Sequence, residues 1–146
     1  MSTGRYATSV FCDDVRQEVG NKISYMGVYQ GIMYIQSFPA VLPKFCVGIQ
    51  AVTPQSHLFE FIKFKLLADD VVIAEQEVTG DLAKKFESAK ENNKSITTNN
   101  DAVFTIKAIL QLQPFAIEKP TKLTVRVENE GEELKAIGLH ILEASS

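Results

Sequence analysis

Apolar and polar residues alternate with a period of two along most of the chain, and this pattern is typical of β-strands with one buried face. The expected strands cover residues 7–12, 22–29, 31–36, 45–52, 60–67, 71–78, 104–113, 123–127 and 137–141. Asp69-Asp70 and the run from Asn129 to Glu132 interrupt the pattern with residues that favour tight turns, so each predicts a hairpin. The chain is therefore expected to be mainly β, with about eight strands.

One segment has helical periodicity instead. Between residues 81 and 90, Leu82, Phe86 and Ala89 fall on one helical face, and Asp81 is a good N-cap. Helices and strands do not alternate elsewhere, which argues against a parallel doubly wound sheet. We predict one domain over residues 1–146: a single antiparallel β-sandwich of immunoglobulin-like build with one short helix. A closed barrel stays open as an alternative, because strand alternation does not separate the two.

Composition narrows the class of protein. The chain has 146 residues and a net charge of −3, with its acidic residues spread out. A duplex-binding surface needs clustered Lys and Arg, so nucleic acid is not an expected partner. No apolar run is long enough for a membrane span, and residues 1–6 lack the apolar middle of a secretory signal. We therefore expect a cytoplasmic protein in which Cys12 and Cys46 are reduced and buried.

The usual signatures of catalysis are missing from the sequence. The glycines are scattered, so no phosphate-binding loop is formed, and the cysteines and histidines lie too far apart for a zinc motif. We assign no catalytic residue, no metal and no cofactor, and the sequence leans away from an enzyme without excluding one.

The segment from Asp13 to Lys22 concentrates charge of both signs, with five charged groups in ten residues. Because its first part, Asp13 to Glu18, follows an apolar strand and precedes Gly20, we expect a strand-ending turn there. In one interpretation, Arg16 bridges the neighbouring carboxylates and clamps the first two strands. In the other, the charged groups form a small-ligand or hydrolytic site made of Asp14, Arg16, Glu18, Lys22 and Lys44.

A second candidate surface lies on the expected strand before Asp69. Phe59, Phe61, Lys63 and Lys65 alternate onto one face, where rings and cations could contact a protein or, less readily, stack the bases of single-stranded nucleic acid. Ile109 and Leu142 are further apolar positions expected to be exposed. We predict a non-enzymatic interaction module that binds another protein, with a homodimer as one form.

The charged segment also carries a family resemblance. Asp13 to Lys22, the strand Tyr25 to Tyr29 and the element Leu42 to Phe45 resemble an uncharacterised family of small bacterial proteins, some from phage-associated regions. The likeness covers the first third of the chain and implies a bacterial or phage origin. No activity comes with it. It marks Asp14, Arg16, Glu18, Lys22 and Lys44 as family positions.

Overall fold

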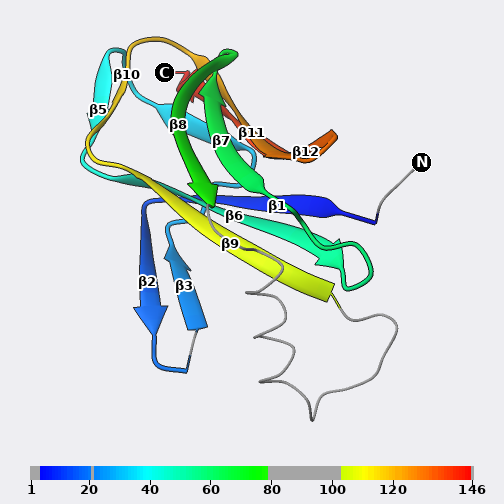
Figure 1. Cartoon of the computed structure of the whole chain (residues 1–146). Coiled ribbons are helices and arrows are strands. Elements are labelled where there is room, and N and C mark those ends of the chain that lie inside the picture. The colour runs from blue at the N-terminus through cyan, green and yellow to red at the C-terminus, as the bar shows by residue number, and fades with distance from the viewer. Residues whose placement is uncertain (1–3, 21, 79–102, 146) are drawn as a thin grey trace.

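The computed structural model describes residues 4–20, 22–78 and 103–145, which fold into twelve β-strands (Figure 1). They are β1 (Tyr6–Cys12), β2 (Asp14–Glu18), β3 (Lys22–Met26), β4 (Ile32–Ile35), β5 (Ala40–Leu42), β6 (Phe45–Pro54), β7 (Ile62–Ala68), β8 (Val71–Val78), β9 (Val103–Leu112), β10 (Phe115–Ile117), β11 (Thr121–Asn129) and β12 (Glu132–Glu143). The mainly β prediction is confirmed. The helix expected at residues 81–90 lies outside the described residues.

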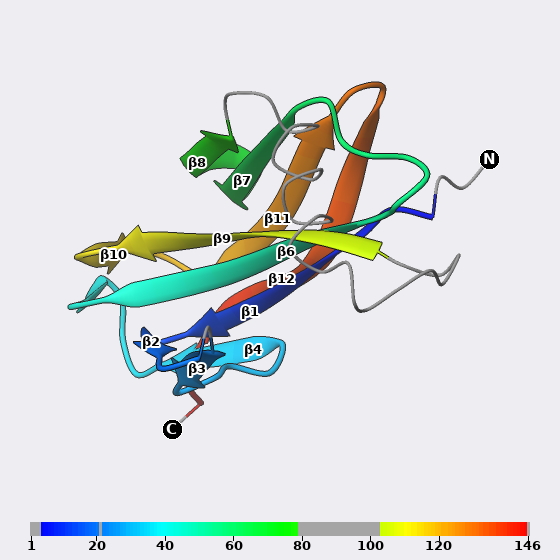
Figure 2. The same ribbon diagram turned by 60° about the horizontal axis from the view of Figure 1, so that its bottom comes forward.

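The strands form four sheets. A three-stranded sheet has the order β1-β6-β9, and a five-stranded sheet has the order β4-β12-β11-β7-β8. Two-stranded sheets join β10 with β5 and β2 with β3. Figure 2 shows β6 between β1 and β9, with the hairpin β2–β3 beside the end of β1. The prediction of a wholly antiparallel arrangement is wrong in one place, because β4 pairs with β12 in parallel.

One buried hydrophobic cluster contains residues of both the three-stranded and the five-stranded sheets. The alternating residues of β6, β7 and β11 that were expected to be apolar all belong to one buried cluster. Phe45 is fully buried within it, and its ring stacks on Phe115 at 5.0 Å and on Phe11 at 6.2 Å between centroids. β6 is buried on both faces, unlike the half-buried strand that alternation suggested. The hairpin β2–β3 covers its second face near Gly48, as described below.

Both predicted hairpin turns are confirmed. Asp69 and Asp70 adopt φ values of 47° and 70°, which suit a two-residue turn between β7 and β8. The second turn joins β11 to β12, where Asn129 pairs with Glu132.

Strict alternation over residues 137–141 predicts that Ile137, Leu139 and Ile141 share the buried face of β12, but this is wrong at Ile137, which is 75% exposed. The pairing of β12 with β11 shifts by one residue between Leu123 and Val125, so a β-bulge reverses the alternation before Leu139. Gly138 permits this bulge, because a Cβ there would clash with the carbonyl oxygen of Leu123.

Candidate functional site

The charged segment forms a β-hairpin rather than the strand-ending turn that we expected. β2 pairs with β3 so that Arg16 faces Ser24 and Glu18 faces Lys22. The hairpin projects away from the larger sheets (Figure 1). Since alternate residues share a face, Asp14, Arg16, Glu18 and Lys22 all lie on one side of it. The sequence did not reveal the strand because its polar face and its other, mixed face do not alternate cleanly.

Of the five predicted site residues, the structure brings two into contact. Lys44 Nζ lies 2.6 Å from Asp14 Oδ1, just before β6 begins. The hydrogen bond from Lys44 lowers the pKa of the Asp14 carboxyl, and the Val15 backbone N–H adds to this effect. The same bond raises the pKa of Lys44. The first and last elements of the family resemblance therefore meet at an ion pair.

The other three predicted residues do not converge with this pair. Arg16, Glu18 and Lys22 are exposed and follow the hairpin face toward its tip. Within the described part of the chain, none of the three forms a direct ion pair. The clamp expected at Arg16 is therefore not formed there. Because these three side chains follow one another along an exposed face, they suit contact with an extended surface better than enclosure of a small molecule.

Two thiols lie beneath the hairpin. Cys12 and Cys46 are direct partners across β1 and β6, and both are buried and free. Burial, with the neighbouring Cys46 and Asp13, raises the pKa of Cys12 to about 11. Burial also raises the pKa of Cys46, and Lys44 offsets only part of the rise. The expectation that both cysteines are buried is confirmed.

Tyr25 holds the hairpin against the same face of β6. Its ring lies so close to Gly48 that a Cβ at residue 48 would be 2.7 Å from Tyr25 Cε1. Gly48 is two residues from Cys46, so both face the hairpin. Glycine at this position therefore makes room for the aromatic ring.

Backbone bonds and one further tyrosine fix the base of the hairpin to β1. The Asp13 N–H donates to the Met26 carbonyl at 2.9 Å, and the Tyr29 N–H donates to the Phe11 carbonyl at 2.8 Å. The Tyr29 hydroxyl donates to the Asp13 carboxylate. Burial and the Asp13 carboxylate together raise the pKa of Tyr29 to about 12.

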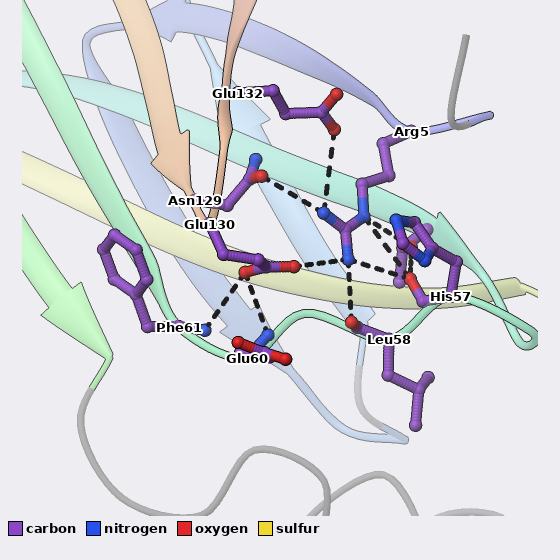
Figure 3. A network of polar contacts seen from close by, with 9 residues as sticks. Arg5, His57, Leu58, Glu60, Phe61, Asn129, Glu130 and Glu132 are labelled. Carbon is purple, nitrogen blue, oxygen red and sulfur yellow. Dashed lines mark hydrogen bonds and ion pairs between the residues drawn. The ribbon is translucent and has the colours of Figure 1, made fainter. Parts of the chain in front are cut away.

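A buried arginine that the sequence did not single out organises the opposite end of β1 (Figure 3). The Arg5 side chain is 1% exposed, and its Nη2 lies 2.6 Å from Glu130 Oε1. Its guanidinium also donates to Thr53, Asn129 and the carbonyls of His57 and Leu58. Glu130 further accepts from the Glu60 N–H at 3.0 Å. Arg5 therefore ties the start of the described chain to two loops that are distant in sequence.

All three nitrogen atoms of the Arg5 guanidinium contact oxygen atoms of carboxylate, amide, hydroxyl or carbonyl groups, so the side chain acts as a structural clamp. Burial by itself would raise the pKa of Glu130, but hydrogen bonds from backbone N–H groups and from Arg5 lower it below its usual value. The Asn129 side-chain nitrogen is buried without a hydrogen-bond partner among the described residues. No sequence signal marks Arg5, because it is a single arginine before an ordinary strand.

The second predicted surface is also rearranged. Phe59 precedes β7, is 1% exposed and lies under the Arg5 guanidinium at 4.5 Å, so its predicted exposure is wrong. Phe61 remains 37% exposed. Lys65 Nζ lies 3.1 Å from Glu128, and Lys63 Nζ lies 3.9 Å from Glu75. The two lysines are thus matched by carboxylates, which weakens their attraction for phosphate.

The described residues contain neither a side-chain cluster suited to a metal ion nor a helix suited to crossing a membrane. These residues contain no group of three or more His, Cys, Asp or Glu side chains placed to hold a metal ion. They also contain no helix with the length and apolar character needed to cross a membrane.

Comparison with known proteins places the chain in a family without giving it an activity. A search of curated proteins finds no match to the sequence. One family model, described as a family of unknown function, matches residues 7–142 and so includes both the hairpin and the thiol pair. The chain therefore belongs to this family of unknown function, DUF6941.

Proposed function

We propose that this protein is a non-enzymatic interaction module that docks a strand of a second copy along β4. The observation that supports it is an exposed apolar group on the outer face of the five-stranded sheet. Ile32 and Tyr34 of β4 are 42% and 64% exposed, and Leu142 of β12, which is 38% exposed, pairs in register with Tyr34. Exposed apolar groups of this kind commonly mark contact sites.

The position of β4 suits strand addition. It ends the order of the five-stranded sheet, and its only hydrogen-bonded neighbour among the described strands is β12. Edge strands are normally protected from pairing by charged residues, proline or bulges. The opposite edge, β8, carries Glu75 and Glu77, whereas residues 31–37 contain no charged residue and no proline. β4 therefore lacks the residues that usually prevent an edge strand from pairing with another chain, and its composition favours strand addition.

A second copy of β4 fits this edge. In an antiparallel pairing centred on Met33, Ile32 of each copy would face Tyr34 of the other on the outer side. Met33 would face its counterpart on the inner side, where it is already buried. No like charges would oppose each other in this arrangement.

Other parts of the proposal are supported more indirectly. We include a cytoplasmic location, because Cys12 and Cys46 are both free. We also include an immunoglobulin-like sandwich of the three-stranded and five-stranded sheets, because β6 and β11 contribute to one core cluster. The small-ligand site on the hairpin and the single-stranded nucleic-acid surface stay as predictions, and neither is favoured by the contacts described above.

The test compares two lysine substitutions in sedimentation velocity over a range of protein concentrations. Wild-type protein is expected to dimerise, and Tyr34→Lys is expected to remain monomeric because it places a charge on the open edge. Tyr6→Lys is the matched control, since Tyr6 is a 53% exposed strand tyrosine outside β4, and it should dimerise normally. A wild-type protein that stays monomeric at the highest concentration contradicts self-docking. Dimerisation that survives in Tyr34→Lys would move the interface away from β4.

A further inference from the structure

The cysteine pair has a geometry that permits a covalent bond. Phe11 accepts a hydrogen bond from Tyr29 and Asp13 donates one to Met26, so both use backbone groups that point away from β6. Because these groups alternate along a strand, those of Cys12 point toward β6. Cys12 and Cys46 are therefore a hydrogen-bonded cross-strand pair, and in pairs of this kind the Cα atoms lie about 5.5 Å apart. Disulfides span Cα separations of about 4.4–6.8 Å.

Both sulfur atoms lie on the face that the hairpin covers. Phe11 and Phe45, the preceding residues in each strand, point into the core and stack on each other. Their neighbours Cys12 and Cys46 must then point to the opposite face. The backbone N–H groups of Asp14 and Val15 lie close enough to the thiols to lower the pKa values of Cys12 and Cys46, respectively, against the rise caused by burial. The first residues of β2 therefore lie directly over the two thiols.

A bridge at this position would be easy to reduce. Opposed Cβ atoms in a sheet lie about 4.5–5.5 Å apart, and a hydrogen-bonded pair is the wider kind. A disulfide needs about 3.5–4.5 Å between the Cβ atoms, so the strands must be drawn together. Strained disulfides have less negative reduction potentials than structural ones and are the type used in regulation.

We propose that Cys12 and Cys46 form a reversible disulfide, and that the hairpin β2–β3 is the cover that controls access to it. The oxidant is a peroxide. One thiol loses its proton, and the thiolate attacks a peroxide oxygen; the O–O bond breaks, the sulfur becomes a sulfenic acid, and the leaving hydroxide takes up the thiol proton as the first water. The second thiol then attacks that sulfur, and its proton and the sulfenic hydroxyl leave as the second water. The two sulfurs lose two electrons, and the peroxide gains them.

The cover explains why the thiols resist oxidation in the closed state. Both sulfurs are buried, and reaction requires a thiolate that the peroxide can reach. The Tyr25–Gly48 contact and the Asp14–Lys44 ion pair hold the hairpin closed. Opening of the hairpin therefore limits the rate of oxidation.

The experiment treats the full chain with hydrogen peroxide, then denatures it in the presence of an alkylating reagent and measures intact mass and non-reduced peptides. Wild type should lose two hydrogen atoms, escape alkylation and yield a peptide pair linked through Cys12 and Cys46. Addition of dithiothreitol should restore both thiols. Cys12→Ser and Cys46→Ser should each retain one thiol that either takes up alkylating reagent or gains oxygen.

Two tyrosine variants separate the bond from its cover. Tyr25→Ala should oxidise faster than wild type, because its hairpin opens more often, whereas Tyr6→Ala should oxidise at the wild-type rate. A wild-type protein that keeps both thiols free, or gains only oxygen, overturns the disulfide. Equal rates in Tyr25→Ala and wild type overturn the role of the hairpin. Circular dichroism of each variant confirms that it has the wild-type strand content before its rate is compared.

Discussion

Asp14 Oδ1 and Lys44 Nζ lie 2.6 Å apart and join the start of the hairpin to the residue before β6. This contact unites two elements of the family resemblance, and it stands beside the thiol pair. Since both side chains are accessible, the contact positions the hairpin more than it stabilises the whole fold.

The Asp14–Lys44 pair predicts a specific pH dependence. The pKa of Asp14 is lowered in the folded protein from an ordinary value of 3.8. Its contribution to hairpin closure is thus present above that ordinary value and is lost as pH falls through the lower folded pKa. In Lys44→Met, an NMR titration of the Asp14 carboxyl should show the pKa moving up toward 3.8. Lys122→Met, an exposed lysine on β11, should leave it unchanged, and an equal shift in both variants would contradict a direct pair.

Among the described charged residues, Arg5 is expected to contribute most to the free energy of unfolding. Arg5→Ala would leave Glu130 and several loop carbonyls without their buried partner, so it should lower the free energy of unfolding by about 3–5 kcal/mol. The matched variant Arg16→Ala removes an exposed arginine and should change it by less than about 0.5 kcal/mol. Urea denaturation of the two proteins gives both values, and similar losses would show that the hairpin arginine has a clamp role after all.

The bulge in β12 predicts an intolerant glycine. In Gly138→Ala the new methyl group meets the Leu123 carbonyl oxygen, which belongs to a paired strand and cannot rotate away. We expect a loss of about 3 kcal/mol, at the upper end for overpacking. Ile137→Ala, at the exposed neighbouring residue, should cost less than about 1 kcal/mol. Thermal and urea unfolding would reveal the difference, and a tolerated Gly138→Ala would refute the bulge geometry.

Tyr29 should make the protein sensitive to alkali. Its pKa is raised from 10.0 to about 12 in the folded state. The neutral side chain is favoured on folding, so its contribution is complete below pH 10.0 and is lost as pH rises toward 12. Spectrophotometric titration should show a late tyrosinate component that Tyr29→Phe removes, with a milder alkaline loss of stability in that variant. If Tyr6→Phe removed the same late component, that component would belong to Tyr6, and the prediction for Tyr29 would be wrong.

The buried face of a strand could be predicted well from the sequence where apolar and polar residues alternated regularly. The faces of β7, β9 and β11 and the Asp69-Asp70 turn follow from short-range pattern and backbone preference. The pattern failed at β2, where both faces carry polar residues, and at Ile137, where a bulge shifts the faces. It also failed at Phe59, because a loop and a buried cation, not a strand, decide the position of that ring.

The sequence pointed to the region of the candidate site but not to the residues that meet there. The concentration of charge pointed to residues 13–22, but it suggested Arg16 as a clamp, whereas the clamp is Arg5. The pairing of Asp14 with Lys44 and of Cys12 with Cys46 depends on the antiparallel register of β1 and β6 and on the fold of the hairpin. By itself, then, the sequence determined that the chain is mainly β and which residues face inward along most strands, since side-chain alternation is a local property of extended backbone. Only the tertiary structure decided which distant charges and thiols meet, because those contacts depend on how strands far apart in the chain are placed side by side.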